Sequence, residues 1–249
     1  MHNREVSTCC RSLLGRVLGV ALFVGMGGCG PDTAPMPAVG GSGGLSTVPA
    51  VAAGASKRDD RGPLLVVLGD SLTAGLGLET DQAYPALLQE RFRRDGYDLT
   101  VVNAGVSGDT TAAGLRRAEW SLDGDVRILM VALGGNDGLR GLPVEQMQQN
   151  LTEIIALAKG RGILVLLAGM EAPPNYGAAY TSAFRRVFRD VADKFEVAFM
   201  PFLLDGVAAV PTLNQPDGIH PTAEGSAIVA DRVYEALAPL RVGLLPTVR

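Results

Sequence analysis

Two side chains in this 249-residue sequence, Ser71 and His220, have the chemistry of a nucleophile and its base. A serine hydroxyl is hardly ionised at neutral pH, so it attacks a carbonyl carbon only when a neighbouring base takes its proton. The sequence contains two histidines, and the other, His2, falls in a segment that we expect to be removed. His220 is therefore the histidine that remains to act as the base.

The residues around both side chains suit this chemistry. Ser71 follows a short apolar run in Gly69-Asp70-Ser71-Leu72, where small neighbours leave room for its hydroxyl to face a substrate. Asp217 precedes His220 by three residues, and a carboxylate there can accept from one imidazole nitrogen and direct the other toward Ser71. Each motif alone also fits a structural role, with the serine as a helix cap and the aspartate in a surface turn.

Acyl transfer also needs hydrogen-bond donors for the negative charge that develops on the carbonyl oxygen. Asn136, in Gly134-Gly135-Asn136-Asp137, offers a side-chain amide, and Gly105 offers a backbone N–H after another apolar run. Separately, each stretch is a glycine-rich turn. Together with the serine and the Asp–His pair, they predict a site for acyl transfer.

The chain from residue 63 onward alternates short apolar runs with longer amphipathic stretches, which is typical of a parallel sheet covered by helices. We expect strands at 64–68, 99–102, 127–133, 163–167 and 197–200. We expect helices at 84–94, 111–121, 144–159, 178–194 and 222–238, with Trp120 in the core. In such a sheet the reactive residues lie in loops at the carboxyl ends of the strands, where these candidates fall.

Four motif blocks, in this order, resemble the SGNH or GDSL hydrolase superfamily: Gly69-Asp70-Ser71-Leu72, Gly105, Gly135-Asn136-Asp137 and Asp217-x-x-His220. The resemblance implies a three-layer α/β/α sandwich with a mostly parallel five-stranded sheet, as in flavodoxin. It makes Ser71 the nucleophile, His220 the base and Asp217 its orienting carboxylate. The Ser71 N–H, Gly105 and Asn136 become the oxyanion hole, and the superfamily uses no metal or organic cofactor.

Residues 69–77, 103–111 and 173–177 are similar to the periplasmic thioesterase, lysophospholipase and arylesterase branch of this superfamily. This similarity implies hydrolysis of a small acyl ester, thioester or lysophospholipid by a serine esterase. Two alternatives stay open, a carbohydrate O-acetylesterase of the same superfamily and a non-catalytic binding lipoprotein of the cell envelope. We expect a monomer.

Residues 1–29 are typical of an export signal, because three arginines precede an apolar run at 17–26 that is too short to span a bilayer. Met26-Gly27-Gly28-Cys29 resembles the lipobox of bacterial lipoproteins, in which the cysteine is lipidated. Ordinary signal cleavage with an incidental Cys29 is the alternative. Gly30 follows the cysteine in place of an aspartate, which by resemblance to lipoprotein sorting favours a periplasmic protein anchored to the outer membrane.

Composition limits the remaining possibilities. Residues 30–62 are rich in Gly, Pro, Ala and Ser, so we expect a flexible linker there and a hydrolase domain at 63–249. All three cysteines lie within residues 1–29, which leaves the domain without a thiolate for a disulfide or a metal site. The formal net charge of −4 argues against a nucleic-acid partner, which would require a basic surface.

Overall fold

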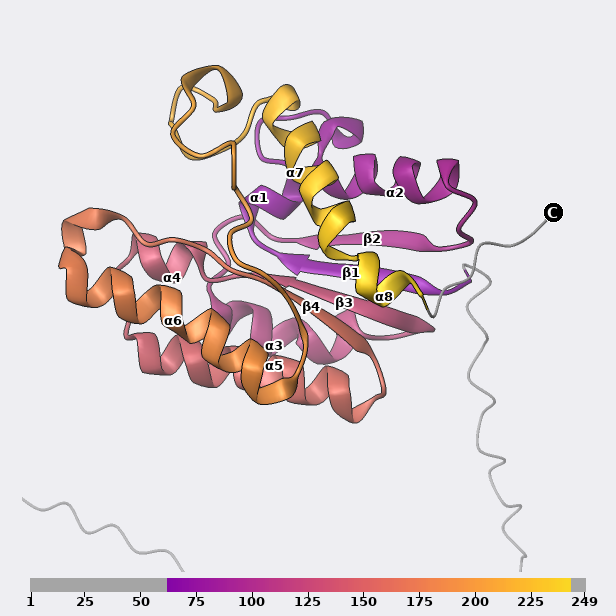
Figure 1. The fold of residues 1–249 in the computed structure, drawn as a ribbon, viewed down its shortest axis with the longest axis horizontal. Helices are drawn as coiled ribbons and strands as arrows, with labels where there is room; N and C mark the ends of the chain where they lie inside the picture. The colour runs from indigo at the N-terminus through magenta and orange to yellow at the C-terminus, as the bar shows by residue number, and fades with distance from the viewer. Residues whose placement is uncertain (1–61, 243–249) are drawn as a thin grey trace, which may run out of the picture. The chain divides into compact units, whose positions relative to one another are not determined.

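The computed structural model describes residues 62–242, which form a parallel sheet between two layers of helices (Figure 1). The strands are β1 (Leu64–Gly69), β2 (Thr100–Gly105), β3 (Val126–Ala132), β4 (Leu164–Ala168) and β5 (Ala198–Met200). Their order in the sheet is β2-β1-β3-β4-β5, the doubly wound order of flavodoxin. This confirms the predicted fold class, whereas the predicted signal segment and almost all of the predicted linker lie outside the described residues.

The register of the central strands determines where the site lies. Every residue of β1 is buried, as expected for a strand covered on both faces. Gly69, the last residue of β1, pairs with Gly105 of β2 and with Ala132 of β3. Because all three strands run parallel, the loops that follow them leave the sheet at the same edge.

Helices cover both faces of the sheet, with α2, α7 and α8 on one face and α3, α5 and α6 on the other (Figure 1). Two short helices, α1 and α4, follow β1 and β3 directly. The helix bounds are α1 Ser71–Ala74, α2 Tyr84–Arg94, α3 Thr111–Ser121, α4 Gly135–Leu139, α5 Val144–Gly160, α6 Gly177–Phe195, α7 Ala223–Ala236 and α8 Ala238–Arg241, with 3-10 turns at Thr80–Gln82, Pro174–Tyr176 and Pro211–Leu213. Among the described helices, none has the length and apolar character needed to cross a membrane.

Local sequence signals begin and end these helices. The side chain of Thr110 accepts from the Ala113 N–H at the start of α3, and Thr222 accepts from the Gly225 N–H at the start of α7. The predicted helix at 222–238 is in fact two helices, because α7 ends before Pro239 and α8 begins next to it. Proline lacks the N–H that would continue the first helix.

Aromatic side chains fill the core on both faces of the sheet. Phe92 of α2 meets the Tyr234 ring of α7 at a centroid distance of 5.2 Å, with the ring planes inclined by 66°. On the other face, Phe184 and Phe188 of α6 lie 5.4 Å apart in a similar edge-to-face contact. Such contacts add to the burial of apolar area that holds each helix on the sheet.

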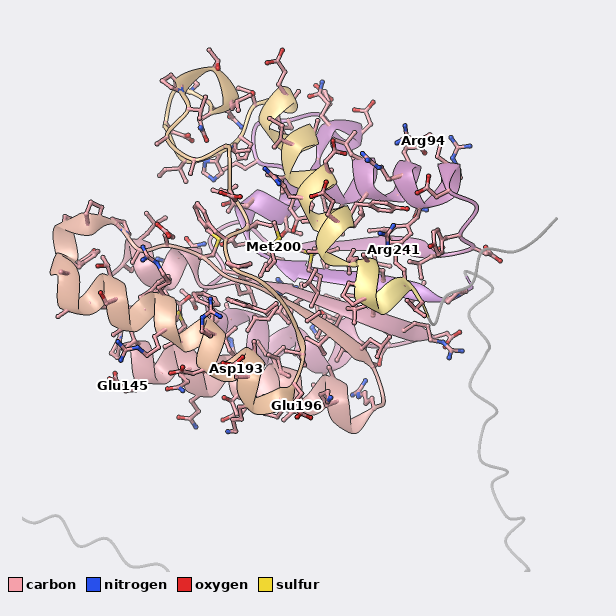
Figure 2. The ribbon with its side chains drawn as sticks, in the orientation of Figure 1. Arg94, Glu145, Asp193, Glu196, Met200 and Arg241 are labelled. Carbon is pink, nitrogen blue, oxygen red and sulfur yellow. The ribbon has the colours of Figure 1, made fainter. Side chains whose placement is uncertain are left out.

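Charged residues cover the outer surface of the layer formed by α5 and α6. Glu145, Asp193 and Glu196 are exposed there, while Met200 lies buried at the end of β5 (Figure 2).

The prediction that Trp120 lies in the core is wrong, because its side chain is 63% exposed near the end of α3.

Candidate active site

Ser71, His220 and Asp217 lie in one hydrogen-bonded chain at the carboxyl edge of the sheet. The Ser71 Oγ atom is 2.9 Å from His220 Nε2, and His220 Nδ1 is 2.7 Å from Asp217 Oδ2. The other carboxylate oxygen, Oδ1, accepts from the backbone N–H groups of Ile219 at 2.9 Å and His220 at 3.0 Å. The structure thus brings a serine close to residues that follow it by about 150 positions in the chain.

The turn between β1 and α1 places the Ser71 hydroxyl at the sheet edge. Ser71 is the first residue of α1, and Asp70 caps this helix by accepting from the Leu72 N–H at 3.0 Å. The helix ends after one turn at Gly75, whose φ of +77° favours glycine. A Cβ atom on Gly75 would also lie 2.6 Å from the Ala83 Cβ, so this position requires glycine for packing as well.

The loop that carries His220 is held in place by the side chain of Gln215. The Gln215 backbone N–H donates to the His220 carbonyl at 2.7 Å. Its side-chain amide donates to the Leu76 carbonyl at 2.7 Å and to the Pro221 carbonyl at 2.9 Å. Since Leu76 follows α1, these bonds connect the histidine loop directly to the serine loop.

The electrostatics of Asp217 determine which imidazole nitrogen carries the proton. Hydrogen bonds from the backbone N–H groups of His220 and Ile219, and then from the imidazole, lower the pKa of the Asp217 carboxyl from 3.8 to about 2. An ionised carboxylate only accepts hydrogen bonds, so His220 Nδ1 must donate to it. His220 Nε2 is then left with its lone pair facing the Ser71 hydroxyl, which is the arrangement that a general base needs.

Two hydrogen-bond donors lie close to the serine. The Ser71 N–H is at the start of α1 and has no acceptor within that helix. The Asn136 side chain, at the start of α4, places Nδ2 at 3.0 Å from the Asp109 carbonyl and at 3.3 Å from Asp70 Oδ2. Both acceptors therefore hold the Asn136 amide at the edge of the sheet beside the serine loop.

Gly105 also lies at this edge, but its N–H is already used. It donates to Asn103 Oδ1 at 3.0 Å, and a Cβ atom on Gly105 would lie 2.3 Å from the Ala74 nitrogen. The position therefore requires glycine so that β2 can pack closely against α1. Three residues later, Gly108 is exposed with φ +85°, and its N–H has no acceptor within residues 62–242. Sequence reasoning missed Gly108, although it belongs to the same glycine-rich turn.

Two buried aspartates near the site have different partners. Burial raises the pKa of the Asp70 carboxyl from 3.8 to about 6, against the lowering effect of hydrogen bonds from Leu72 and Asn136. Asp137 accepts from the backbone N–H of Thr111 at 2.9 Å and from its hydroxyl at 2.7 Å. Asp137 thus secures the start of α3, whereas Asp70 contacts both the serine loop and the Asn136 amide.

Apolar side chains surround the serine. A small cavity beside Ser71 and His220 is lined by residues of α1, α7 and their neighbouring loops, chiefly Leu72, Leu76, Leu78, Leu203, Leu204 and Val229. Exposed apolar side chains also lie in the loops at this edge or soon after them in the sequence, and these are Leu76, Val106, Leu139, Tyr176 and Ile219. Within the described part of the chain, no cluster of three or more His, Cys, Asp or Glu side chains could hold a metal ion.

Comparison with known proteins gives a consistent match over this domain. The model of the GDSL-like lipase/acylhydrolase family matches residues 67–228. Esterase TesA of Pseudomonas aeruginosa is 46% identical over 177 residues, which cover 71% of this chain and 88% of that protein. Thioesterase 1/protease 1/lysophospholipase L1 of Escherichia coli K12 is 38% identical over 177 residues, which cover 71% of this chain and 84% of that protein.

Solved structures agree with the sequence matches. The crystal structure of TesA superposes with a TM-score of 0.68 at 46% sequence identity. The superposition covers 72% of this chain and 99% of that chain, so the likeness extends over the whole of the solved protein.

Proposed function

This chain belongs to the GDSL-like lipase/acylhydrolase family and is an ester-hydrolysing serine hydrolase, and we propose that Ser71, His220 and Asp217 are its catalytic triad. The observation that carries the proposal is the unbroken chain of hydrogen bonds from the Asp217 carboxylate through the imidazole to the Ser71 hydroxyl. Its distances of 2.7 and 2.9 Å are those of ordinary strong hydrogen bonds.

In the proposed mechanism the Ser71 Oγ atom attacks the acyl carbon while His220 Nε2 takes the hydroxyl proton. The imidazolium then gives this proton to the leaving alcohol or thiol, which leaves the acyl group on Ser71 as an ester. A water molecule next attacks this ester while His220 takes a proton from it, and the imidazolium returns that proton to Ser71 Oγ as the acyl–oxygen bond breaks and the carboxylic acid is freed. Asp217, held ionised by its hydrogen bonds, stabilises the imidazolium in both half-reactions.

Three donors are proposed for the oxyanion of each tetrahedral intermediate. They are the Ser71 N–H, the Asn136 side-chain amide and a backbone N–H from the loop 105–108. Within that loop Gly108 is the better-supported donor, because the Gly105 N–H would first have to leave Asn103 Oδ1. The carbonyl of Asp109, next to Gly108, already accepts from the Asn136 amide, so this part of the loop lies against the second donor.

The surroundings of the serine support an acyl ester or thioester substrate. Leucine side chains line the cavity next to Ser71, and exposed apolar residues follow the site loops. Such surfaces favour an alkyl or aryl group over a sugar, which would require several polar partners. The same site could instead hydrolyse acetyl esters of carbohydrates, and acyl-chain length distinguishes the two candidates. The chain's identity as a hydrolase sets aside the non-catalytic lipoprotein.

The first experiment is hydrolysis of p-nitrophenyl esters from acetate to palmitate by the wild-type protein and the Ser71→Ala variant. We expect activity on medium acyl chains, with a loss of about 10⁵- to 10⁶-fold in kcat in the variant and an unchanged melting temperature. Ser182→Ala, at an exposed serine of α6, is the matched control and should retain full activity. Near-normal turnover by Ser71→Ala would remove Ser71 from the mechanism, and activity confined to acetate would favour the carbohydrate esterase.

We further propose that the protein is exported, lipidated on Cys29 and anchored on the periplasmic side of the outer membrane. The support is in the sequence alone, namely the arginines and apolar run before Met26-Gly27-Gly28-Cys29, and these residues lie outside the described part of the chain. Two acyl chains on the cysteine would hold a protein stably at a membrane surface. Since all the proposed catalytic residues come from one chain, we also propose that the enzyme acts as a monomer.

Membrane fractionation of a Gram-negative host tests the anchor. The wild-type protein should sediment with outer-membrane vesicles, and mass spectrometry should find diacylglycerol on the N-terminal cysteine. The Cys29→Ser variant should lose both properties while keeping its esterase activity. A wild-type protein recovered in the soluble periplasmic fraction, with an unmodified N-terminus, would support ordinary signal cleavage instead. Light scattering of the soluble domain then measures its oligomeric state.

A further inference from the structure

A buried arginine lies behind the proposed oxyanion hole, and the hydrolytic mechanism gives it no role. Arg117 belongs to α3, and only 9% of the residue is exposed. Its Nε atom donates to Asp109 Oδ2 at 2.6 Å, Nη1 donates to the Ala104 carbonyl at 2.8 Å, and Nη2 donates to the Gly69 carbonyl at 2.7 Å. A single planar group therefore contacts three separate segments of the carboxyl edge.

Each acceptor adjoins one of the proposed oxyanion donors. Gly69 ends β1 two residues before Ser71, and Ala104 lies where β2 enters the loop 105–108. Asp109 directly follows Gly108, and the Asp109 carbonyl accepts from the Asn136 amide at 3.0 Å. Through its three contacts, Arg117 is thus connected to every backbone or side-chain group that is proposed to bind the oxyanion.

The geometry of these contacts suits a positioning role. A guanidinium is rigid and planar, so the angles between its N–H groups fix the relative positions of the groups that accept from it. The side chains of Arg117 and Asp109 are 11% and 14% exposed, and their charges compensate each other. The pair is therefore held by charge-assisted hydrogen bonds and adds little net charge beside the site.

We propose that Arg117, paired with Asp109, is a positioning residue that holds the ends of β1 and β2 and the loop 105–108 in the arrangement that makes the oxyanion hole. This inference rests on the proposed function of the site. Arg117 itself touches no reacting atom, and it acts through the Ser71, Gly108 and Asn136 donors. Its removal should let these donors move relative to one another.

Such a displacement affects the transition state more than the bound substrate. Oxyanion donors form their strongest hydrogen bonds only when charge develops on the carbonyl oxygen. Misplacement by about 1 Å lowers a rate by about 100-fold. A variant without the guanidinium should therefore lose kcat while KM stays nearly constant.

The test compares Arg117→Met with two control variants of the full-length protein, using a p-nitrophenyl ester of medium chain length. Arg116→Met makes the same change at a neighbouring arginine, whose guanidinium donates, within residues 62–242, to the Ala112 carbonyl of its own helix. Leu122→Ala opens a cavity just after the end of α3, away from the site. It should lower the melting temperature without changing the site. Each variant is assayed for kcat, KM and melting temperature, at a temperature where it is fully folded.

We expect kcat to fall about 100-fold in Arg117→Met with KM within about threefold of the wild type. Both controls should keep the wild-type kcat, including Leu122→Ala despite its lower melting temperature. Wild-type kcat per folded molecule in Arg117→Met would overturn the inference, because the arginine would then contribute to stability alone.

A second variant covers the case in which Arg117→Met does not fold. Arg117→Lys keeps a positive charge opposite Asp109, but one ammonium group cannot reach both strand-end carbonyls in the geometry of a guanidinium. It should fold and still lose most of kcat, whereas full activity would overturn the inference. Ser71→Ala is assayed in parallel. Retained activity in that variant would refute the proposed site itself, a result distinct from normal kcat in the Arg117 variants.

Discussion

Replacing Asp70 by asparagine should change how the stability of the protein depends on pH. Asp70 is only 3% exposed, and burial raises its carboxyl pKa from 3.8 to about 6. At about 1.4 kcal/mol for each pKa unit, the gap between the two values corresponds to about 3 kcal/mol of unfolding free energy. This is a large fraction of the stability of an ordinary domain.

The sign follows from which state binds the proton more tightly. Because the pKa of Asp70 is higher in the folded protein, the folded state holds this proton at pH values where the unfolded chain has released it. The resulting stability is fully present below about pH 4 and is lost as the pH rises through about 6. Asp217 acts in the opposite direction, since its lowered pKa of about 2 gives stability that is lost only as the pH falls toward that value.

Urea unfolding of the wild-type protein and Asp70→Asn between pH 4 and pH 7 isolates the contribution of Asp70 and its interactions, including the one with His220, because groups that do not interact with Asp70 cancel in the difference. Asparagine keeps the size of the side chain and still offers an oxygen to the Leu72 N–H. Relative to the wild type, the variant should gain about 2.4 kcal/mol of unfolding free energy over this range, because the unfolded chain has already released part of its proton at pH 4. Asp123→Asn, at an exposed aspartate, is the control. The reasoning would be refuted if the difference in unfolding free energy between the wild type and Asp70→Asn changed by less than about 0.5 kcal/mol between pH 4 and pH 7.

Two further substitutions test the surroundings of the serine. Asp217→Asn should lower kcat by about 10⁴-fold at a nearly unchanged melting temperature, since an amide can hold His220 in the wrong tautomer; an ester assay with normal turnover would contradict this. Tyr84→Phe should cost about 1–3 kcal/mol in urea unfolding, because the Tyr84 hydroxyl is the buried partner of Thr73 Oγ1 at 2.7 Å. Adding Thr73→Val should recover most of that loss, and no recovery would count against the hydrogen bond as the cause.

Most of the fold could be predicted because its signals are local. The predicted helices at 84–94 and 111–121 have the bounds that the structure shows, and the five predicted strands each overlap an observed strand. The short helices α1 and α4 were missed. A helix of four or five residues is too short to show the repeat of apolar residues that marks a helix in a sequence. These two helices form where the chain turns away from the sheet after β1 and after β3.

The sequence could predict the features of the site that depend on side-chain type and strand order. It could not predict those that depend on the direction of individual backbone N–H groups. That Ser71, His220 and Asp217 lie together could be predicted because few residue types suit the roles of nucleophile, base and orienting acid, and the sheet brings their loops to one edge. The sequence predicted Gly105 as the backbone donor, and the reason to prefer Gly108 could not be obtained from it. This reason depends on where one N–H points, and that is set by the Asn103 side chain.

Helix α3 buries a charged side chain, Arg117, and exposes an aromatic one, Trp120. Parallel strands that end at one edge leave carbonyl groups there, and buried carbonyls need donors. Two of these carbonyls, on Gly69 and Ala104, accept from Arg117, so the inward face of α3 carries an arginine where hydrophobicity would favour an apolar residue. Trp120 lies three residues further along, on the exposed face of the helix. Hydrophobicity alone therefore predicts the wrong environment for Arg117, because the carbonyl groups at the sheet edge need a donor there. Arg117 lies directly behind the proposed oxyanion hole.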